Sequence, residues 1–376
     1  MKILFISHDA TLTGAPILLL NLIKCLKNHG YDCSHFIIKN NNGVLVEDFK
    51  RNGNVLFFNE NLGGNDKGFF GKLKKNIANA RRKENRKNIQ EWIDNSDVIF
   101  SNTITNGDFL KEFYFSENKK VISYVHELEM ASKSFTNTID LDIVIKKTTL
   151  FVVPAEAVRN HLINNLGIDS AKIHRLNYFI PFINEKLENE FKQIKNNFIV
   201  GIIGTLDWRK GAEILPIIMG DFFRKHPELN LKFLWKGFNK EAIEYDRIIY
   251  ELKIIGMLDK ITFEGPSLSV ADFYTSIDVL LLPSKEDPYP LVVLEAASFK
   301  KPSICFLQSG GASEFINNDA GSSVPFLNIR ELTETIYKYY NERNITAAKG
   351  IVAFEQYQKL HNNQLLIAEQ FKKIAF

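Results

Sequence analysis

The 376-residue sequence is poor in the features of disulfide-stabilised, secreted or unstructured proteins. It has only three cysteines, Cys25, Cys33 and Cys305, which form no C-x-x-C pair, and an odd number fits a disulfide framework badly. No uninterrupted apolar run is long enough to span a membrane, and M-K-I-L-F-I-S-H-D at the start is too short in apolar residues for a signal-peptide core. No long Gly, Ser or Gln tract is present. We therefore expect an ordered, cytoplasmic protein.

The sequence also has little net charge and lacks common cofactor motifs. Lys and Arg number 47 and Asp and Glu number 44, a net charge of +3, which argues against a dedicated nucleic-acid binder. No H-E-x-x-H, P-loop or G-x-G-x-x-G string occurs. No nucleic-acid partner, metal or organic cofactor is therefore expected.

Short apolar runs alternate with helical or polar segments along the whole chain. A first series lies at residues 2–7, 33–38, 55–58, 97–102, 121–126 and 150–154. A second series with the same pattern lies at residues 197–206, 231–237, 260–265, 278–284 and 302–306. Strands this apolar, separated by helices, predict parallel sheets covered on both faces.

The two series predict two domains. The polar stretch at residues 181–197 is the best linker candidate. We expect an α/β protein with two doubly wound Rossmann-like domains facing across a cleft, at residues 1–190 and 191–355. Residues 356–376 are expected to be helical, and the pattern does not show where they pack. Ligands of such domains bind beyond the carboxyl ends of the strands.

A single carboxylate, Glu295, ends an aliphatic run that two prolines introduce in E-D-P-Y-P-L-V-V-L-E-A, residues 286–296. The run predicts a loop and then a helix whose first position is Pro290. Because the neighbouring helix positions are apolar or small, Glu295 is expected to project from a buried helix, where an unpaired carboxylate is costly. An internal salt bridge or the hydroxyl groups of a ligand would both satisfy it.

Seven strings spread over nearly the whole chain resemble the nucleotide-sugar-dependent glycosyltransferases of family 4, which have the two-domain GT-B fold. A single such string is weak evidence, whereas seven in register are strong. The strings are T-G-A-P (13–16), Y-V-H-E (124–127), G-T-L-D-W-R-K-G (204–211), F-L-W-K-G (233–237), I-T-F-E-G (261–265), P-S-K-E-D-P-Y-P-L-V-V-L-E-A (283–296) and S-G-G-A-S-E-F (309–315).

The resemblance implies roles for several residues of the second domain. Arg209 and Lys210, in the loop that Gly204 opens, would contact the donor diphosphate, although an isolated Arg-Lys pair is more often solvated. The family carries two glutamates eight positions apart. The second is Glu295, which would bind the ribose hydroxyls, and Asp287 stands at the first position, facing the transferred sugar. Glu286 is the alternative for the first carboxylate.

Backbone groups of the same domain would add to the donor site. The helix that begins at Pro290 offers its N-terminal amides to an anion, and Leu291 and Val292 are the best free donors, because proline has no N–H. Gly310 and Gly311 suit a tight loop at a strand end, while Glu314 could cap the following helix.

On the first domain, the resemblance implies a site at two loops. The small residues Gly14 and Ala15 would let the backbone approach a phosphate or acceptor, although Gly14 could equally be a turn glycine. The family has a histidine near the reacting sugar at the position of His126, and Glu127 follows it directly. A lone histidine is more often a structural hydrogen-bonding residue.

Enzymes of family 4 are retaining, and no second carboxylate is identified here as a nucleophile. The resemblance therefore implies a front-face substitution assisted by the leaving phosphate. Metal independence is expected because cations and a helix terminus already neutralise the diphosphate. The string D-L-D at residues 140–142 is treated as a coincidental match to the D-x-D metal motif, since it follows a polar segment.

The basic segment at residues 69–87 has Phe70, Leu73, Ile77 and Ala80 at helical spacing among many cations. This pattern fits a helix on an anionic membrane surface, a helix docked on its own domain or, less well, a nucleic-acid contact. The first interpretation would place the protein at the inner face of the cell membrane, with a lipid-linked acceptor.

The sequence thus predicts a glycosyltransferase that moves a sugar from a nucleoside diphosphate sugar to a hydroxyl group of a glycan or lipid-linked acceptor, in the synthesis of a surface polysaccharide or related glycan. Two alternatives stay open. One is a nucleotide-sugar epimerase or hydrolase of the same fold. The other is a non-catalytic binding protein, for which Asp287 in place of glutamate is the argument.

Overall fold

A computed structural model describes residues 1–59, 69–182, 197–267 and 269–376, with the backbone alone for residues 69–75. The chain forms two compact units, and neither is continuous in sequence. Unit 1 comprises Met1–Pro154, Val158–Phe179 and Gln364–Phe376, and unit 2 comprises Ala155–Ala157 and Ile180–Asn363.

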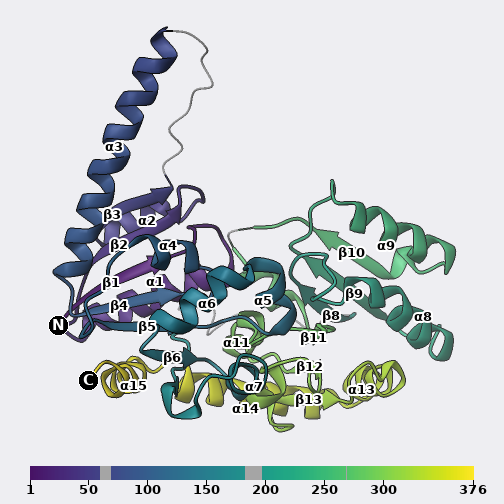
Figure 1. The fold of residues 1–376 in the computed structure, drawn as a ribbon. Coiled ribbons are helices and arrows are strands. Elements are labelled where there is room, and N and C mark those ends of the chain that lie inside the picture. Colours follow the sequence, from purple (N-terminus) through teal and green to yellow (C-terminus); the bar gives the residue numbers. More distant parts are fainter. Residues whose placement is uncertain (60–68, 183–196, 268) are drawn as a thin grey trace. The chain divides into compact units, whose positions relative to one another are not determined.

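Unit 1 contains a seven-stranded sheet in which all paired strands are parallel, with the order β3-β2-β1-β4-β5-β6-β7 (Figure 1). The order reverses between β1 and β4, which makes the carboxyl ends of these two strands the topological switch point. The strands are β1 (Lys2–Ser7), β2 (Asp32–Asn40), β3 (Asn54–Asn59), β4 (Val98–Asn102), β5 (Lys120–Tyr124), β6 (Leu150–Val153) and β7 (Ile173–Arg175).

The register of the sheet aligns large aromatic side chains in the core of unit 1. Phe5 of β1 is the register partner of both Phe36 in β2 and Phe100 in β4, and its ring lies 6.2 and 5.5 Å from theirs. The helices around the sheet are α1 (Gly14–Asn28), α2 (Val46–Asn52), α3 (Phe69–Asp94), α4 (Gly107–Glu112), α5 (Glu129–Phe135), α6 (Thr138–Lys147), α7 (Glu156–Asn164) and α15 (Gln364–Ala375), with a 3-10 turn at Ser170–Lys172.

Unit 2 repeats this topology with six parallel strands in the order β10-β9-β8-β11-β12-β13. Its switch point lies between β8 and β11. The strands are β8 (Phe198–Ile203), β9 (Leu231–Lys236), β10 (Ile261–Glu264), β11 (Val279–Leu282), β12 (Ser303–Phe306) and β13 (Gly321–Val324).

The helices of unit 2 cover a core that includes the fully buried Trp235 and Phe222. They are α8 (Leu215–Lys225), α9 (Ile243–Ile254), α10 (Ala271–Ser276), α11 (Leu291–Ser298), α12 (Ala312–Ile316), α13 (Ile329–Asn341) and α14 (Arg343–Leu360), with 3-10 turns at Ala212–Ile214 and Leu258–Lys260.

The predicted fold class of two Rossmann-like domains is confirmed. The linker candidate at residues 181–197 lies mostly outside the described residues. One helix start was misplaced by a residue: α11 begins at Leu291, and Pro290 precedes it with extended backbone (φ −68°, ψ 119°). Among the described residues, no helix is long and apolar enough to cross a bilayer.

The C-terminal residues divide between the two units. Residues up to Leu360 complete α14 in unit 2, whereas α15 returns to unit 1 and contacts α1. Phe371 of α15 is fully buried, with its ring 5.8 Å from Phe100 and 5.5 Å from Tyr31. The last helix is therefore part of the core of the first unit.

Phe371→Ala should lower the free energy of unfolding of unit 1 by about 3–5 kcal/mol, because it leaves a cavity among Phe100, Tyr31 and their neighbours. The matched control is Phe376→Ala, whose side chain is 76% exposed and whose cost should stay within about 0.5 kcal/mol. Denaturant unfolding followed by circular dichroism measures both. Equal losses in the two variants would contradict the packing of α15.

Candidate functional site

The loops that follow β8 and β11 are bound to each other at the switch point of unit 2. The carbonyl oxygen of Arg209 accepts hydrogen bonds from the amides of Lys285 (2.7 Å) and Glu286 (3.2 Å). Nζ of Lys210 donates to Oδ2 of Asp287 at 2.6 Å. The side chains of this ion pair are 20% and 9% exposed. The structure thus brings together Arg209, Lys210 and Asp287, which lie about 80 positions apart in the sequence.

Glycine is required where these loops meet. Gly211 has φ +69°, and a Cβ atom there would lie 2.0 Å from the carbonyl oxygen of Pro283. Gly204 (φ +143°) begins the same loop, and the side chain of Lys210 passes 3.5 Å from the position that a Cβ would take. The absence of a side chain at Gly211 lets the two loops approach closely, whereas at Gly204 it is the positive φ that favours glycine.

The loop after β12 joins the same group. The amide of Asp287 donates to the carbonyl of Ser309 at 2.7 Å, and Asp287 forms a parallel bridge with Gly310. The amide of Gly311 donates to the carbonyl of Pro288 at 2.8 Å, where a Cβ on Gly311 would lie 2.5 Å from the same oxygen. The two glycines therefore hold the loop that carries Asp287. Their contact with a ligand stays a prediction.

Both candidate first carboxylates are buried. Glu286 is 8% exposed and Asp287 is 6% exposed, but the ion pair with Lys210 is formed by Asp287. Ser284 also lies near Asp287, with its hydroxyl 3.4 Å from Oδ2. The geometry therefore connects Asp287 directly to the basic loop.

Glu295 has a tyrosine as its partner rather than a cation. The hydroxyl of Tyr274 in α10 donates to Oε2 of Glu295 at 2.6 Å, and Tyr274 is fully buried. No Lys or Arg of the described chain forms an ion pair with Glu295, so the salt-bridge alternative is wrong there. Burial raises the pKa of Glu295 above its ordinary value of 4.5, and the Tyr274 hydrogen bond opposes this increase.

The start of α11 lies between these carboxylates. The amide of Val293 donates to the carbonyl of Pro290 at 3.2 Å. Leu291 and Val292 precede it, in the first turn, where an α-helix has N–H groups without intrahelical acceptors. These two amides lie at a helix N-terminus, where the helix dipole favours negative charge. Their position suits the predicted phosphate contact.

In unit 1, Gly14 is the first residue of α1 and follows β1 at the switch point. Its φ is not in the positive range, and a Cβ there would have no atom within 4 Å. Neither backbone conformation nor packing requires glycine, so the interpretation of Gly14 as a turn residue finds no support. The carbonyl of the next residue, Ala15, accepts a hydrogen bond from Asn102 at the end of β4 (3.0 Å).

His126 follows β5 and has hydrogen bonds to both ring nitrogens. Nε2 lies 2.8 Å from Oδ1 of Asn102, and Nδ1 lies 2.9 Å from the hydroxyl of Tyr178. Because the amide nitrogen of Asn102 donates to Ala15, the network assigns the proton to Nε2 and makes Nδ1 the acceptor. Burial lowers the pKa of His126 to about 3, with a smaller contribution from His8. His126 is therefore a neutral group near pH 7.

Glu127 ties the loop after β5 to the loop after β4. Its Oε2 accepts hydrogen bonds from the amides of His126 (2.9 Å) and Ile104 (3.2 Å). The residue is 7% exposed. These bonds give Glu127 a loop-positioning role, whereas a direct role in chemistry stays a prediction.

Sequence reasoning did not select Tyr274, Asn102 or Tyr178, which form hydrogen bonds with Glu295 and His126. Their only sequence signal is a polar group next to an apolar run. Lys236 was also missed, although it is a lysine at the end of a buried strand. Its Nζ lies 3.2 Å from Oε2 of Glu264, and its carbonyl accepts from the amide of Gly204 (2.9 Å). Lys236 is thus a further cation beside the Arg209–Lys210 loop.

The described residues contain no group of three or more His, Cys, Asp or Glu side chains that could hold a metal ion. The D-L-D string lies in α6, where the amide of Asp140 donates to the capping side chain of Asn137. Glu314 accepts from the amide of Glu156 at 2.9 Å, so its carboxylate is bonded to the start of α7, while its predicted capping of the helix that follows Gly311 stays a prediction.

Comparisons with known proteins agree with this geometry. Residues 184–361 match the family described as Glycosyl transferases group 1. The solved structure of Anabaena Alr3699/HepE in complex with UDP-glucose has a TM-score of 0.73 and 16% identity, and the alignment covers 99% of this chain and 98% of that one. The family match covers less than half of the chain, and the likeness to this solved structure shows the fold alone.

Other similar proteins are also distant in sequence. A structure of a mutant S. aureus TarM, in complex with fondaparinux, α-GlcNAc-glycerol and UDP, has a TM-score of 0.76 and 13% identity, with both chains fully covered. An uncharacterized glycosyltransferase of Haemophilus influenzae is 27% identical over 35% of each chain. The amylovoran biosynthesis glycosyltransferase AmsD of Erwinia amylovora is 23% identical over 45% of this chain. These two matches span only 35% and 46% of the relatives' own lengths.

Glu295→Gln should change how stability depends on pH. The native pKa of Glu295 is raised, so the native state binds this proton more tightly than the unfolded state does. Wild-type stability from this group is therefore greatest below the unfolded pKa near 4.5 and is lost as pH rises through the native pKa. The variant should gain stability relative to wild type as pH rises above about 4.5 in denaturant titrations. The exposed Glu251→Gln is the control, and a constant difference would contradict the burial of the charge.

Asn102→Asp should raise the pKa of His126 by at least about 1, because a carboxylate would replace the amide oxygen 2.8 Å from Nε2 and favour the imidazolium form. Nuclear magnetic resonance of the labelled imidazole against pH measures the change. Asn344→Asp, at an exposed position of α14, should leave it unchanged. An unchanged pKa in folded Asn102→Asp would show that the two side chains are not in contact.

Proposed function

We propose that this protein is a retaining glycosyltransferase of family 4, which transfers a sugar from a nucleoside diphosphate sugar to a hydroxyl acceptor. The observation that carries the proposal is the meeting of three loops of unit 2, in which Lys210 is paired with Asp287 shortly before the start of α11. The reaction needs fixed positive potential at the departing diphosphate more than it needs a covalent nucleophile.

The basic loop and the helix start would bind the donor diphosphate. Arg209 and Lys210 supply two cations beside the first turn of α11, whose amides Leu291 and Val292 add a partial positive charge. In the free protein Lys210 is paired with Asp287. A donor would therefore place its phosphate against a lysine that Asp287 already orients, with the transferred sugar next to Asp287.

Glu295 would bind the ribose. Its Oε2 is occupied by Tyr274, and its raised pKa shows that burial disfavours the charged form. Two ribose hydroxyls donating to the carboxylate would offset this penalty. Donor binding would thus lower the free-energy cost of keeping the Glu295 carboxylate charged.

Unit 1 would bind the acceptor. Within unit 1, the acceptor is proposed to bind at the open space beside Gly14 and at the end of β5. His126, neutral and hydrogen-bonded on both nitrogens, would act as a positioning dipole rather than as a proton acid. Deprotonation of the acceptor is then left to the leaving phosphate, as a front-face mechanism requires. Product analysis that shows inversion at the anomeric carbon would contradict this mechanism.

A uridine diphosphate sugar is the first donor to test, since the HepE structure contains UDP-glucose and the TarM structure contains UDP. The AmsD relative suggests a polysaccharide acceptor, by its name. Transfer is proposed to need no metal ion, because Arg209, Lys210 and the helix start supply positive potential. Full activity in the presence of EDTA is the corresponding check.

Donor binding should raise the melting temperature of the wild type with one nucleotide of a panel of UDP, GDP, ADP, dTDP and CMP and their sugar conjugates. At a concentration 100-fold above Kd the stabilisation is about 2.7 kcal/mol. Glu295→Ala and Lys210→Ala should lose most of this response, because they remove the ribose and diphosphate contacts. The exposed Glu251→Ala should keep it.

The outcomes of this panel separate the alternatives. A response to no nucleotide, in folded wild-type protein, would contradict donor binding. Donor turnover without any acceptor would favour the epimerase or hydrolase, and binding without turnover would favour the non-catalytic protein. Activity that survives Asp287→Asn but not Glu286→Gln would assign the first carboxylate to Glu286.

A further inference from the structure

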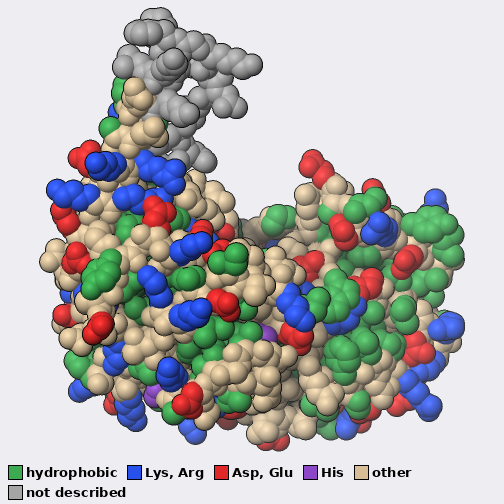
Figure 2. Space-filling model, viewed as in Figure 1, with side chains coloured by type: hydrophobic (Ala, Val, Ile, Leu, Met, Phe, Trp, Pro, Cys, Tyr) green, Lys and Arg blue, Asp and Glu red, His purple; other side chains and the backbone are tan. Residues whose placement is uncertain are grey.

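Positive charge is concentrated in one segment of α3. Residues 69–87 contain eight Lys or Arg residues and one acidic residue, Glu84, a net charge of +7 in a chain whose total is +3. The rest of the chain is therefore net negative. Figure 2 shows basic side chains gathered over the described part of α3, at the upper left. Such a local asymmetry points to an anionic partner of that segment.

Residues 76–84, in the basic segment of α3, do not pack on the rest of unit 1. Of residues 76–84, all are exposed except Ala78, which is partly buried, and the helix becomes buried only at Asn85, Ile89 and Ile93. Figure 1 shows the N-terminal part of α3 extending beyond the strands of its sheet. The interpretation of residues 69–87 as a docked helix therefore fails for residues 76–84.

An exposed helical segment with apolar residues is marginal alone, because most helical stability in proteins comes from packing of an apolar face. Ile77 is 48% exposed, and Ala80 lies three residues further along the helix. Phe70 and Leu73, which share the same sequence spacing, lie outside the residues with described side chains. The described segment thus combines exposed apolar residues with three consecutive cations, Arg81, Arg82 and Lys83.

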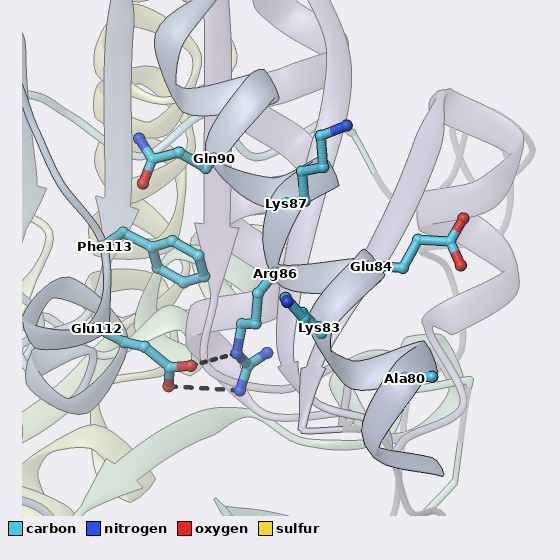
Figure 3. A pocket seen from close by; sticks show the side chains of 8 residues that line it. All are labelled: Ala80, Lys83, Glu84, Arg86, Lys87, Gln90, Glu112 and Phe113. Carbon is cyan, nitrogen blue, oxygen red and sulfur yellow. Dashed lines mark hydrogen bonds and ion pairs between the residues drawn. The ribbon is translucent and has the colours of Figure 1, made fainter. Parts of the chain in front are cut away.

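A hollow of about 640 Å³ lies beside this segment and extends its charged surface. Figure 3 shows its lining, which comes from α3 and the end of α4: Ala80, Lys83, Glu84, Arg86, Lys87, Gln90, Glu112 and Phe113. Arg86 is bonded to Glu112 and to the carbonyl of Phe58, so it has a structural role. Nζ of Lys87 lies 3.7 Å from Oε1 of Glu91. The hollow offers Lys83 and Lys87 to a phosphate group.

We propose that residues 76–87 of α3, with this hollow, bind the surface of a bilayer that contains anionic phospholipid. The cations meet the lipid phosphates, while Ile77 and Ala80 enter the boundary between headgroups and acyl chains. An apolar side chain between cations suits a lipid surface better than a nucleic acid, which is bound by aromatic stacking and backbone charge. A protein held there would meet a lipid-linked acceptor without leaving the membrane.

Co-sedimentation of the full chain with vesicles tests this proposal. Wild type should bind vesicles of equal parts phosphatidylglycerol and phosphatidylcholine, less so at high salt, and should not bind phosphatidylcholine alone. Arg81→Glu/Arg82→Glu/Lys83→Glu should weaken binding at least about tenfold. Lys232→Glu/Lys240→Glu/Lys253→Glu, which makes the same change of net charge at exposed positions of unit 2, should bind as wild type does.

Further variants test the contribution of charge and that of the apolar contact separately. Arg81→Lys/Arg82→Lys should retain binding, because it keeps the charge. Ile77→Ser should weaken binding, whereas Ile254→Ser, at a position that is 69% exposed in unit 2, should not. The donor-induced rise in melting temperature should be the same in all of these variants. A loss of vesicle binding can therefore be distinguished from a loss of donor binding, on which the proposed activity depends.

Three results would overturn the proposal. The first is no binding of wild type to anionic vesicles at low salt. The second is equal binding by wild type and the triple reversal at Arg81, Arg82 and Lys83, or an equal loss in the unit 2 control. The third is tighter binding of an oligonucleotide than of vesicles with the same dependence on these cations, which would assign the segment to nucleic acid.

Discussion

The ion pair between Lys210 and Asp287 is the contact on which the geometry of the unit 2 loops depends. It joins the loop after β8 to the loop after β11 at 2.6 Å, and two backbone hydrogen bonds to the carbonyl of Arg209 support it. A pair shielded to this extent is costly to break, because removal of either partner leaves an uncompensated charge. The contact also leaves Lys210 oriented before any ligand arrives, which reduces the ordering that binding would require.

The two units hold their polar residues in different ways. In unit 2 the half-buried Glu295 has a neutral tyrosine as its hydrogen-bond partner, which leaves the carboxylate charge only partly compensated. In unit 1 the neutral His126 has a partner on each ring nitrogen. The Glu295 carboxylate can therefore accept further hydrogen bonds, whereas both ring nitrogens of His126 are already paired. This contrast is the reason to propose direct ligand contact for Glu295 and a positioning role for His126.

Total charge is a poor description of this chain. A net charge of +3 suggests a surface with no preferred partner, yet residues 69–87 alone have a net charge of +7, and the remainder of the chain is net negative. Since surface electrostatics act within about 8–10 Å at ordinary ionic strength, the local cluster on α3 matters more to a partner than the sum does. The lack of packing around residues 76–84 makes that cluster accessible.

The sequence by itself determined the fold class and the strand ends that carry the motifs. Apolar runs separated by helices allow few arrangements other than parallel sheets covered on both faces, and glycine and proline patterns located the loops. The start of α11 was misplaced by one residue, because proline is accepted both at the first helical position and before it.

Only the tertiary structure decided which side chains satisfy one another. The sequence left a salt bridge and a ligand as alternatives for Glu295, and the structure placed Tyr274, 21 positions away, in contact with it. It also paired Lys210 with Asp287 and surrounded His126 with Asn102 and Tyr178. A local sequence pattern does not specify such contacts, because they depend on strand order and on the close approach of loops far apart in the chain. The packing of α15 on unit 1 also depends on residues far apart in the chain, because Phe371 packs against Phe100 and Tyr31.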